Sequence, residues 1–438
     1  MSDFNRRSFL HTATGALAAT ATGAATAATT ATARTDANSR IGVAVLGVNG
    51  RGREHLDHLV NIDDCEVVAL CDPDQEVLAR AAKWVEEKTG RAPAQETDLR
   101  KLYERNDVAA VTVATPNHWH SLATIWACQA GKDVYVEKPG SHNLFEGRQM
   151  IAAAKKYDRI VQHGVQLRSS PAIQEAVEHL RGGTIGDVYM ARGLVYRWRP
   201  SVGTQPDSAA PATLNWDLWQ GPAAARPFSK RYVHYNWHWH WDYGNGDVGN
   251  QGVHETDMCL WGLGAGLPSR INAMGGKFLW HDDKETPEQL TTNYYFPETN
   301  QMVQFEVRPW VTNSEAGATV GNIFYGSKGI LVVKGYGNYE IYFGQKNEPG
   351  PKRSAGNELR LHFENWLAAV RSRDAGSLHG PIETAHTSAG LAHLGNIAYR
   401  VGRQLEFDPA TETFPGDDEA NAYLTRAYRA PFVVPEVV

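Results

Sequence analysis

The segment IGVAVLGVNGRG, residues 41–52, decides the fold of this chain. Its first six residues form an unbroken apolar run, which is typical of a strand buried on both faces of a parallel sheet. A glycine-rich turn at residues 47–52 follows at once, and residues 53–60 predict a helix. Strand, turn and helix in this order form the context that a dinucleotide-binding fingerprint requires. We therefore expect a nucleotide phosphate on the backbone N–H groups at the start of that helix.

The match of this turn to the GxGxxG fingerprint is incomplete. Gly47 and Gly52 stand at the first and last glycine positions, and Asn49 replaces the middle glycine. Asparagine tolerates positive φ better than most residues do, and Gly50 beside it leaves additional room. We expect the whole turn, Arg51 included, to contact the cofactor.

Residues 66–72, EVVALCD, predict a second strand that ends in an acid. Asp72 follows Gly47 at close to the ~20-residue offset at which a carboxylate binds ribose hydroxyls in this kind of fold. Because a carboxylate there repels a 2′-phosphate, we expect NAD as the cofactor, with NADP left open.

A third strand and its helix lead to a conspicuous lysine. Residues 108–115 predict the strand, residues 116–130 predict the helix, and the strand at 133–137 ends in Glu137-Lys138-Pro139. Ligands of open α/β sheets bind outside the carboxyl ends of the strands, so Lys138 stands where a substrate hydroxyl would bind. The alternation over residues 41–138 predicts a doubly wound α/β domain. The cofactor contacts that we expect here are Thr115, Pro116, Asn117, His120, Glu137 and Lys138.

Together these motifs resemble the Gfo/Idh/MocA oxidoreductases. The resemblance rests on TPNHWH at residues 115–120, AGKDV at 130–134 and EKP at 137–139. It extends to GDV at residues 186–188, NQGVHETD at 250–257 and GSKG at 326–329. NWDLWQGP at residues 215–222 and the tail at 391–407 resemble the exported branch of the family. The match spans roughly residues 40 to 430 and is specific for the family rather than for a substrate.

The resemblance implies a nucleotide-binding Rossmann domain at residues 40–165 and a second domain at 166–438. The second domain is expected to contain a large open, mostly antiparallel sheet and covering tail helices, so the fold class is α/β followed by α+β. The resemblance also implies a nicotinamide-dependent enzyme that acts on a sugar or polyol. In that enzyme Lys138 would bind the reacting hydroxyl and His254 would take or give the proton.

One position departs from the family pattern. The family usually has an aspartate four residues before the histidine, where this chain has Asn250. Asn250 orients a neighbour but holds no charge, so we consider Asp257 and Asp247 as replacements. On a helix, Asn250, His254 and Asp257 share one face, and with Lys138 they are the catalytic residues that we expect. Glu255 is interpreted as a solvated neighbour.

The segment HYNWHWHWDY, residues 234–243, is the most aromatic part of the chain. In an extended strand its histidines and Asp242 would share one face and its tryptophans the other. A sugar-binding wall, ordinary packing or a subunit contact, and a metal site at His238, His240 and Asp242 all fit this pattern. We favour the wall and predict no metal. The substrate contacts that we expect are Gln166, Arg168, Trp237, His238, Trp239, His240 and Tyr243, with Tyr196, Arg197 and Arg199 as weaker candidates.

Residues 1–33 predict an export leader rather than part of the fold. NRRSFL at residues 5–10 resembles a twin-arginine signal, and a run of Ala, Thr and Gly ends in a small-residue cleavage motif at 31–33. We therefore expect a periplasmic protein that is exported folded with its nucleotide retained. The net charge of −6 offers no basic surface for nucleic acid, and no later segment predicts membrane insertion.

Three functions remain open. The lead is a periplasmic NAD(P)-dependent oxidoreductase acting on a hydroxyl or ketone of a sugar, polyol or glycoside. The second is a glycosidase that oxidises a ring carbon transiently, with Tyr243, His238 or His240 as the base on the other ring face. The third is a non-catalytic sugar-binding protein, which Asn250 favours. Because sheets of this family commonly pair face to face, we expect a homodimer or homotetramer.

Overall fold

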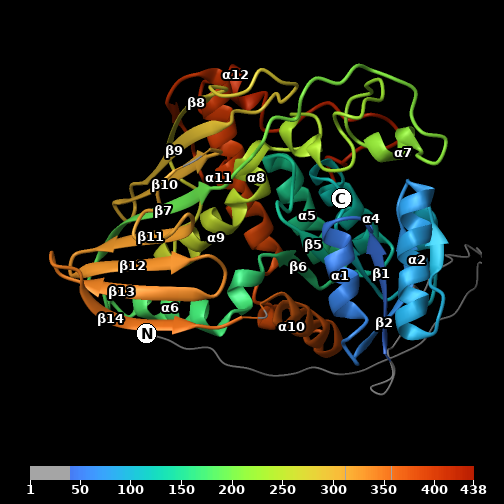
Figure 1. Ribbon diagram of the computed structural model, residues 1–438, viewed down its shortest axis with the longest axis horizontal. Coiled ribbons are helices and arrows are strands. Elements are labelled where there is room, and N and C mark those ends of the chain that lie inside the picture. Colours follow the sequence, from blue (N-terminus) through green and yellow to red (C-terminus); the bar gives the residue numbers. More distant parts are fainter. Residues whose placement is uncertain (1–39, 311, 357) are drawn as a thin grey trace, which may run out of the picture. The chain divides into compact units, whose positions relative to one another are not determined.

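The computed structural model describes residues 40–438 except 311 and 357, and the leader expected at residues 1–33 lies outside the described residues. The described residues belong to one compact unit. Within it lie a six-stranded sheet and a nine-stranded sheet (Figure 1). The two sheets confirm the expected fold class, a Rossmann-type layer followed by a mostly antiparallel one.

The six-stranded sheet belongs to the nucleotide domain, and all of its strands pair in parallel. Its order is β3-β2-β1-β4-β5-β6, so the chain changes direction between β1 and β4. Such a switch point opens a crevice at the carboxyl ends of the strands. The strands are β1 (Ile41–Leu46), β2 (Cys65–Cys71), β3 (Ala94–Glu96), β4 (Ala110–Val113), β5 (Asp133–Glu137) and β6 (Val161–Gly164).

Local sequence explains where the helices of this domain begin. The Asp74 side chain accepts from the N–H groups of Glu76 and Val77 at the start of α2, and Asn143 caps α5 in the same way. The first helix begins two residues earlier than predicted because the glycine-rich turn is tight. The helices are α1 (Arg51–Leu59), α2 (Gln75–Thr89), α3 (Leu99–Tyr103), α4 (Asn117–Gln129) and α5 (Leu144–Lys156).

The nine-stranded sheet has the order β14-β13-β12-β11-β7-β10-β9-β8-β15. The β7–β10 pair is parallel and the other pairs are antiparallel. The expected hairpin turn at residues 326–329 joins β11 to β12. The strands are β7 (Val188–Tyr196), β8 (Arg270–Gly276), β9 (Gln289–Phe296), β10 (Gln301–Arg308), β11 (Val320–Gly326), β12 (Gly329–Lys334), β13 (Asn338–Phe343), β14 (Glu348–Ser354) and β15 (Leu405–Glu406).

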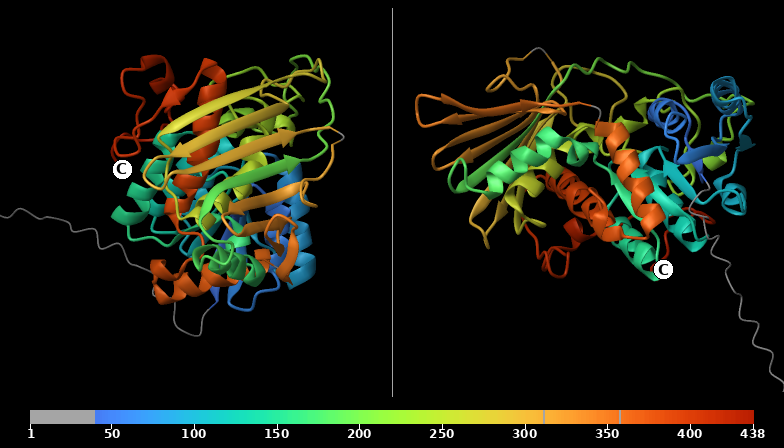
Figure 2. Two further views of the ribbon diagram at one scale, coloured as in Figure 1. Left: turned by 90° about the vertical axis from the view of Figure 1, so that its left-hand side faces the viewer. Right: turned by 90° about the horizontal axis from the view of Figure 1, so that it is seen from below.

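Helices α6 (Pro171–Arg181), α9 (Gly252–Leu263) and α11 (Ile382–Val401) lie along one face of this sheet (Figure 2). Their apolar side chains share a core with the inward residues of the strands, Phe305 and Phe324 among them. The short helix α8 (Gly246–Asn250) precedes α9 and is separated from it by Gln251. The remaining elements are η1 (Gln166–Ser169), α7 (Trp216–Gln220), η2 (Asn236–Trp239), α10 (Glu358–Ser372), η3 (Ala375–Ser377) and α12 (Asp418–Asn421).

The C-terminal part of the chain completes the core of the nucleotide domain. Phe363 and Trp366 of α10 are fully buried in one cluster with residues of β1 and α1. Phe432, in the last residues of the chain, is buried with Trp119 of α4 on the other side of the sheet. The C-terminal part of the chain therefore contributes side chains to both faces of the six-stranded sheet.

Residues 197–245, which we call the covering segment, lie between β7 and α8 and carry α7 and η2. The segment contacts the nucleotide domain through backbone bonds, in which Gln75 N–H donates to the Thr213 carbonyl and Asn215 N–H to the Pro73 carbonyl, both at 2.9 Å. In Figure 1 it passes above α2 and α4. The covering segment therefore spans from the second domain to the carboxyl ends of the nucleotide-domain strands.

Three further features lie outside the pairing of the sheets. Residues 234–243 do not form an extended strand, because η2 turns the chain at residues 236–239, so the two-faced arrangement considered for this segment does not form. All four cysteines are buried free thiols. None of the helices in the described residues is long and apolar enough to cross a membrane.

Candidate active site

A cavity of about 560 Å³ lies at the carboxyl ends of β1, β2, β4 and β5. The nucleotide domain, the covering segment and the α8–α9 junction all contribute to its lining. Its size is within the usual range for small-molecule sites. Most of the residues predicted to bind cofactor line it, namely Gly47, Asn49, Gly50, Arg51, Asp72, Thr115, Pro116, Asn117, His120, Glu137 and Lys138.

The glycine-rich turn is a tight backbone cradle. A Cβ on Gly52 would lie 1.7 Å from the Gly47 carbonyl oxygen, and a Cβ on Gly47 would lie 2.8 Å from the Ala114 carbonyl oxygen. Gly52 therefore packs beneath the turn, and no side chain blocks access to the start of α1. The buried Thr115 hydroxyl oxygen has no protein partner. These features fit a dinucleotide, whose phosphates take backbone N–H donors and whose polar groups satisfy such orphaned atoms.

Asp72 is held at the end of β2 by two backbone donors. One carboxylate oxygen accepts from the Val48 N–H and the other from the Asp74 N–H, each at 3.0 Å. Burial raises the pKa of Asp72 to about 6, so the group is mostly ionised at neutral pH. Asp98 also lines the cavity, near the end of β2, whereas Glu54 pairs with Arg51. Carboxylates at a ribose position disfavour a 2′-phosphate and fit NAD.

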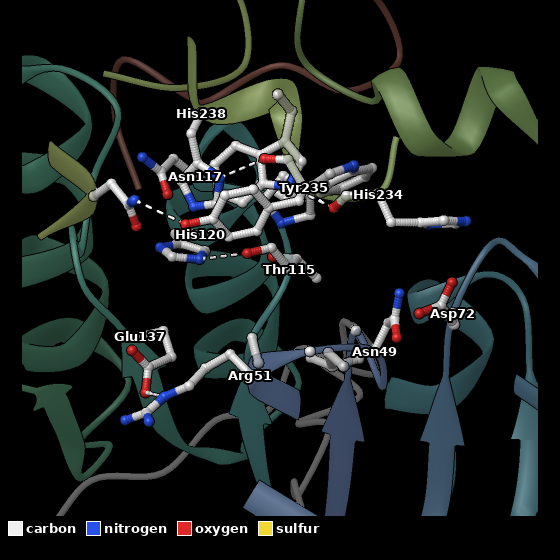
Figure 3. Close-up of a pocket in the computed structure, with 18 of the residues that line it drawn as sticks. Asn49, Arg51, Asp72, Thr115, Asn117, His120, Glu137, His234, Tyr235 and His238 are labelled. Carbon is white, nitrogen blue, oxygen red and sulfur yellow. Dashed lines mark hydrogen bonds and ion pairs between the residues drawn. The ribbon is translucent and has the colours of Figure 1, made fainter. Parts of the chain in front are cut away.

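Arg51 ties the glycine-rich turn to the end of β5. Its Nε donates to Glu137 Oε1 at 2.8 Å, and His55 Nε2 lies 3.0 Å from the same oxygen (Figure 3). Burial alone would raise the pKa of Glu137, but Arg51 and His55 hold it well below its usual value. Glu137 is thus a charged anchor between two strand ends, with Lys138 as the next residue.

Lys138 and Asn250 meet where the two domains face the same cavity. Lys138 Nζ donates to the Asn250 backbone carbonyl at 2.7 Å, and the Asn250 side-chain amide donates to the Tyr235 hydroxyl at 3.3 Å. Burial lowers the pKa of Lys138, and the adjacent Glu137 opposes this shift by stabilising the charged form. The ammonium is therefore fixed by a neutral acceptor, with its other hydrogens available to a ligand.

His254 lines the cavity from the first turn of α9. Its Nδ1 is buried without a partner, and its ring meets Tyr336 edge-on at 5.4 Å between centroids. Burial, with a contribution from the nearby Lys138, holds the pKa of His254 well below 6.5. The imidazole is therefore neutral at physiological pH and able to accept a proton.

Gln251 and Tyr336 also line the cavity, and no local pattern had singled them out. Gln251 Oε1 accepts from Arg197 at 3.1 Å and from the Tyr336 hydroxyl at 3.0 Å, and its Nε2 donates to Glu255 Oε1 at 3.1 Å. Gln251 lies within the NQGVHETD motif at residues 250–257. Tyr336 lies in the turn between β12 and β13, which contains no recognisable motif. The interpretation of Glu255 as solvated is wrong, because it is buried and burial raises its pKa to about 8.

The structure does not bring Asp257 or Arg168 to the cavity lining. Both Asp257 oxygens accept from Arg168, at 2.8 Å each, and the Ser388 hydroxyl donates to the same carboxylate at 2.6 Å. The pair joins η1 to α9 and α11. Asp257 is therefore not the replacement acid for Asn250, and Arg168 is not placed as a sugar contact. Gln166 also lies in η1, and it does line the cavity.

Asp247 is the acid closest to Asn250. Its two oxygens accept from Arg199 at 2.7 and 2.8 Å, and Asn250 Nδ2 lies 3.4 Å from Oδ1. Asp247 therefore forms an ion pair with Arg199 rather than interacting with His254.

The aromatic segment contributes only part of the expected wall. Trp237 and His238 line the cavity with their rings stacked at 3.6 Å, and Tyr235 and His234 stand beside them (Figure 3). Trp239, His240 and Tyr243 do not line it. Tyr243 is fully buried, and His240 lies 3.5 Å from Glu285.

The geometry does not support a metal site at His238, His240 and Asp242. Asp242 pairs with Arg226, and His240 lies beside Glu285, so the charge of each carboxylate has a partner within the protein. Among the described residues, 40–438 without 311 and 357, no group of three His, Cys, Asp or Glu side chains is arranged to hold a metal ion.

Two family models match the chain. Residues 41–165 match an oxidoreductase family with an NAD-binding Rossmann fold. Residues 188–274 and 355–434 match the C-terminal alpha/beta domain of an oxidoreductase family.

Curated relatives are matched over part of their length. A glycosyl hydrolase family 109 protein of Shewanella sp. (strain ANA-3) is 32% identical over 176 residues, covering 36% of this chain and 39% of the relative. One from Saccharopolyspora erythraea is 28% identical over 210 residues, covering 43% of this chain and 45% of the relative. The chain thus spans less than half the length of these relatives.

Solved structures share the fold over most of the chain. The WlbA dehydrogenase from Bordetella pertussis, in complex with NADH and UDP-GlcNAcA, superposes with a TM-score of 0.64 at 19% identity, covering 84% of this chain and 99% of that one. The aldose-aldose oxidoreductase from Caulobacter crescentus, complexed with glycerol, gives 0.63 at 19% identity, covering 84% and 100%.

Proposed function

The chain belongs to the Gfo/Idh/MocA oxidoreductase family, and from this premise we propose that it oxidises a hydroxyl, or reduces the matching ketone, of a sugar, polyol or glycoside with NAD. The observation that carries the proposal is that Lys138 and His254 share one cavity with the glycine-rich turn. The sugar-related names of the similar proteins support a carbohydrate substrate.

The residues divide the work between binding and proton transfer. Bound NAD would supply the hydride acceptor. Lys138, oriented by the Asn250 carbonyl, donates a hydrogen bond to the substrate oxygen and holds it in the cavity. The neutral His254 takes the hydroxyl proton, a contribution that is typically worth about 100- to 10,000-fold in rate. The covering segment excludes water from the reacting groups.

The covering segment supports our proposal that the nucleotide is retained. Leu218, Trp219, His234 and Trp237 line the cavity from this segment, opposite the glycine-rich turn. His234 Nε2 lies 3.2 Å from Asp74, next to Asp72. A dinucleotide between these two walls would leave only after the segment moves, and the carboxylates at this end favour NAD over NADP.

Location and assembly are further parts of the proposal. The twin-arginine pattern supports a periplasmic protein, and a retained nucleotide suits a compartment that does not supply one. Among the described residues, the face of the nine-stranded sheet opposite α9 and α11 has no covering helix (Figure 2), and Met274 on β8 is 81% exposed. This face supports pairing in a homodimer or homotetramer.

A glycosidase working by transient oxidation is the second candidate function. The similarity to glycosyl hydrolase family 109 proteins favours it. Of the three bases considered for the elimination step, His238 alone lines the cavity. Burial lowers the pKa of His238 to about 3, so its ring is neutral and able to accept a proton. The third reading, a non-catalytic binding protein, is disfavoured because Lys138 and His254 stand together.

The experiment is to denature the purified mature protein and assay the extract for nicotinamide nucleotide. Stoichiometric NAD(H) supports retained-cofactor chemistry, and sugars are then screened for a change in the absorbance of the bound nucleotide. Release of sugar from an aryl glycoside without net redox change supports the glycosidase. An empty protein that binds neither NAD nor NADP refutes both enzyme functions, and an empty protein that binds one supports an exchanging dehydrogenase.

A further inference from the structure

The charges around the cavity are unevenly divided between the two domains. Every carboxylate in its lining comes from the nucleotide domain: Glu54, Asp72, Asp98 and Glu137. Residues from position 166 onward contribute two arginines, Arg197 and Arg199, and no carboxylate. The part of the lining contributed from residue 166 onward therefore presents guanidinium groups and no carboxylate.

Arg197 is the arginine of this wall without a carboxylate partner. Arg199 is neutralised by the bidentate contact with Asp247. Arg197 makes one side-chain hydrogen bond, to Gln251 at 3.1 Å, and no described Asp or Glu lies within ion-pair distance of it. A guanidinium has five N–H donors in a planar fork. Most of the donors of Arg197 are thus free for a ligand.

Arg197 is exposed, and its one side-chain hydrogen-bond partner, the Gln251 amide oxygen, leaves its charge uncancelled. Gln251 is fixed on its other sides by Tyr336 and Glu255. Glu255 lies behind Gln251 in a buried position, where burial raises its pKa to about 8, so it is largely uncharged at neutral pH. Gln251 and Tyr336 also present polar groups beside the guanidinium.

We propose that the substrate sugar carries an anionic substituent, a carboxylate or a sulfate ester, and that Arg197 binds it. This inference rests on the proposed function and names its substrate class. Arginine binds planar carboxylates and sulfate-like oxyanions through two parallel N–H bonds, which lysine cannot reproduce. The remaining N–H donors of Arg197 would bind this group, while Lys138 and His254 act on a hydroxyl elsewhere on the sugar.

The test uses matched methyl glycosides of glucose and galactose, each as the primary alcohol, the hexuronate and the 6-sulfate. Reduction of the bound nucleotide is followed for each with the unaltered, nucleotide-loaded protein. Since a hydrogen bond to a charged group contributes more than a neutral one, kcat/KM for the preferred anionic member should exceed that of its neutral parent about 10- to 100-fold. The ratio between the hexuronate and the sulfate identifies which anion the site takes. The preference should shrink as salt is raised.

Variants locate the effect. Arg197→Met should bring the ratio of anionic to neutral kcat/KM close to one, and Arg197→Lys should give an intermediate ratio because it keeps the charge but loses the fork. Arg80→Met, on the exposed face of α2, is the matched control and should leave the ratio unchanged.

Three outcomes would overturn the inference. Turnover of neutral members at equal or greater efficiency refutes it while supporting the proposed function. An anionic preference that survives in Arg197→Met refutes the assignment of the site. If no sugar in the panel changes the nucleotide, the proposed function and this inference fail together.

Discussion

At the scale of single residues, His254 distinguishes a reactive site from a binding site. We expect His254→Asn to lower kcat for sugar-dependent reduction of the nucleotide about 100- to 10,000-fold, because proton transfer loses its acceptor. The nucleotide released on denaturation should remain stoichiometric, since the phosphate cradle is unchanged. His281→Asn, an exposed position outside the cavity lining, is the control. Full activity in His254→Asn would show that another group takes the proton.

The lowered pKa of His254 sets a second expectation, for the pH profile. Its folded-state pKa lies well below 6.5, so the ring stays neutral as the pH falls from 8 to about 6. The proton acceptor therefore remains competent over this range, and kcat/KM should show no acid limb near pH 6.5. A limb at that pH, measured in buffers of constant ionic strength, would contradict the buried environment of His254.

The residues of the site were predictable where they belong to a recognisable sequence motif. Lys138, His254 and the glycine-rich turn were predicted and line the cavity, apart from Gly52 beneath it. Helical spacing placed Asp257 on the same face as His254, and α9 contains both residues, but Asp257 pairs with Arg168 and does not line the cavity. Tyr336 was missed because only tertiary folding brings the β12–β13 turn to the cavity.

At the scale of elements, the glycine-rich turn tolerates no side chain at Gly52. In Gly52→Ala the new Cβ would lie 1.7 Å from the Gly47 carbonyl oxygen, so the turn must open and the start of α1 must shift. We expect loss of bound nucleotide and a lower melting temperature. Gly266→Ala, where a Cβ meets nothing within 4 Å, should change neither. Stoichiometric nucleotide in Gly52→Ala would refute the assigned phosphate cradle.

The covering segment should control how fast nucleotide leaves. His234→Ala removes the contact to Asp74, a partly exposed pair that contributes at most about 1 kcal/mol. Dissociation of NAD, followed by dilution into a nucleotide scavenger, should become up to about 5-fold faster, since 1.4 kcal/mol corresponds to tenfold. His58→Ala, on α1 outside the cavity lining, serves as the control. An unchanged rate would mean that the segment is held by its backbone bonds alone.

Elements with a simple period were predictable, and the aromatic segment was not. The strands at residues 41–46 and 133–137 were predicted at their observed bounds, because an apolar run between turn residues has few other interpretations. The alternation of Trp and His at residues 237–241 imitates a strand. There Trp237 N–H bonds to the Tyr232 carbonyl and Gly244 N–H to the His240 carbonyl, so packing among aromatic rings overrides the pattern.

At the scale of the whole molecule, buried neutral histidines predict acid sensitivity. Burial lowers the pKa of five of them to about 3 or 4, while an unfolded chain takes up these protons near pH 6.5. The unfolded state therefore binds more protons as the pH falls below 6.5. For each such histidine, the free energy of unfolding falls by about 1.4 kcal/mol for every unit by which the pH drops, until the pH reaches the pKa of that histidine in the folded state. The five are His118, His163, His238, His362 and His393.

We expect the melting temperature to be highest above pH 6.5 and to fall steeply between pH 6.5 and 5. Asp72 and Glu255, whose pKa values are raised, oppose this trend but are fewer. Differential scanning fluorimetry across this range checks the expectation, and His281→Asn should keep the same slope because that side chain is exposed. A constant melting temperature would contradict it.

The division into two sheets was predictable from the motifs, but the path of the tail was not. Nothing local in Phe432 or Trp366 indicates that they belong to the core of a domain that begins at residue 40. Such contacts join distant parts of the sequence, and only the folded chain reveals them.

That return of the tail has a consequence for biosynthesis. The nucleotide domain leaves the ribosome first, yet its core stays open until the final residues, including Phe432, have been made. At about 5–20 residues per second, the intervening domain takes on the order of 15 to 50 s to synthesise. The core of the nucleotide domain is therefore completed only after Phe432 has been synthesised, and a chain stalled before that point would carry an exposed apolar surface that chaperones and proteases recognise.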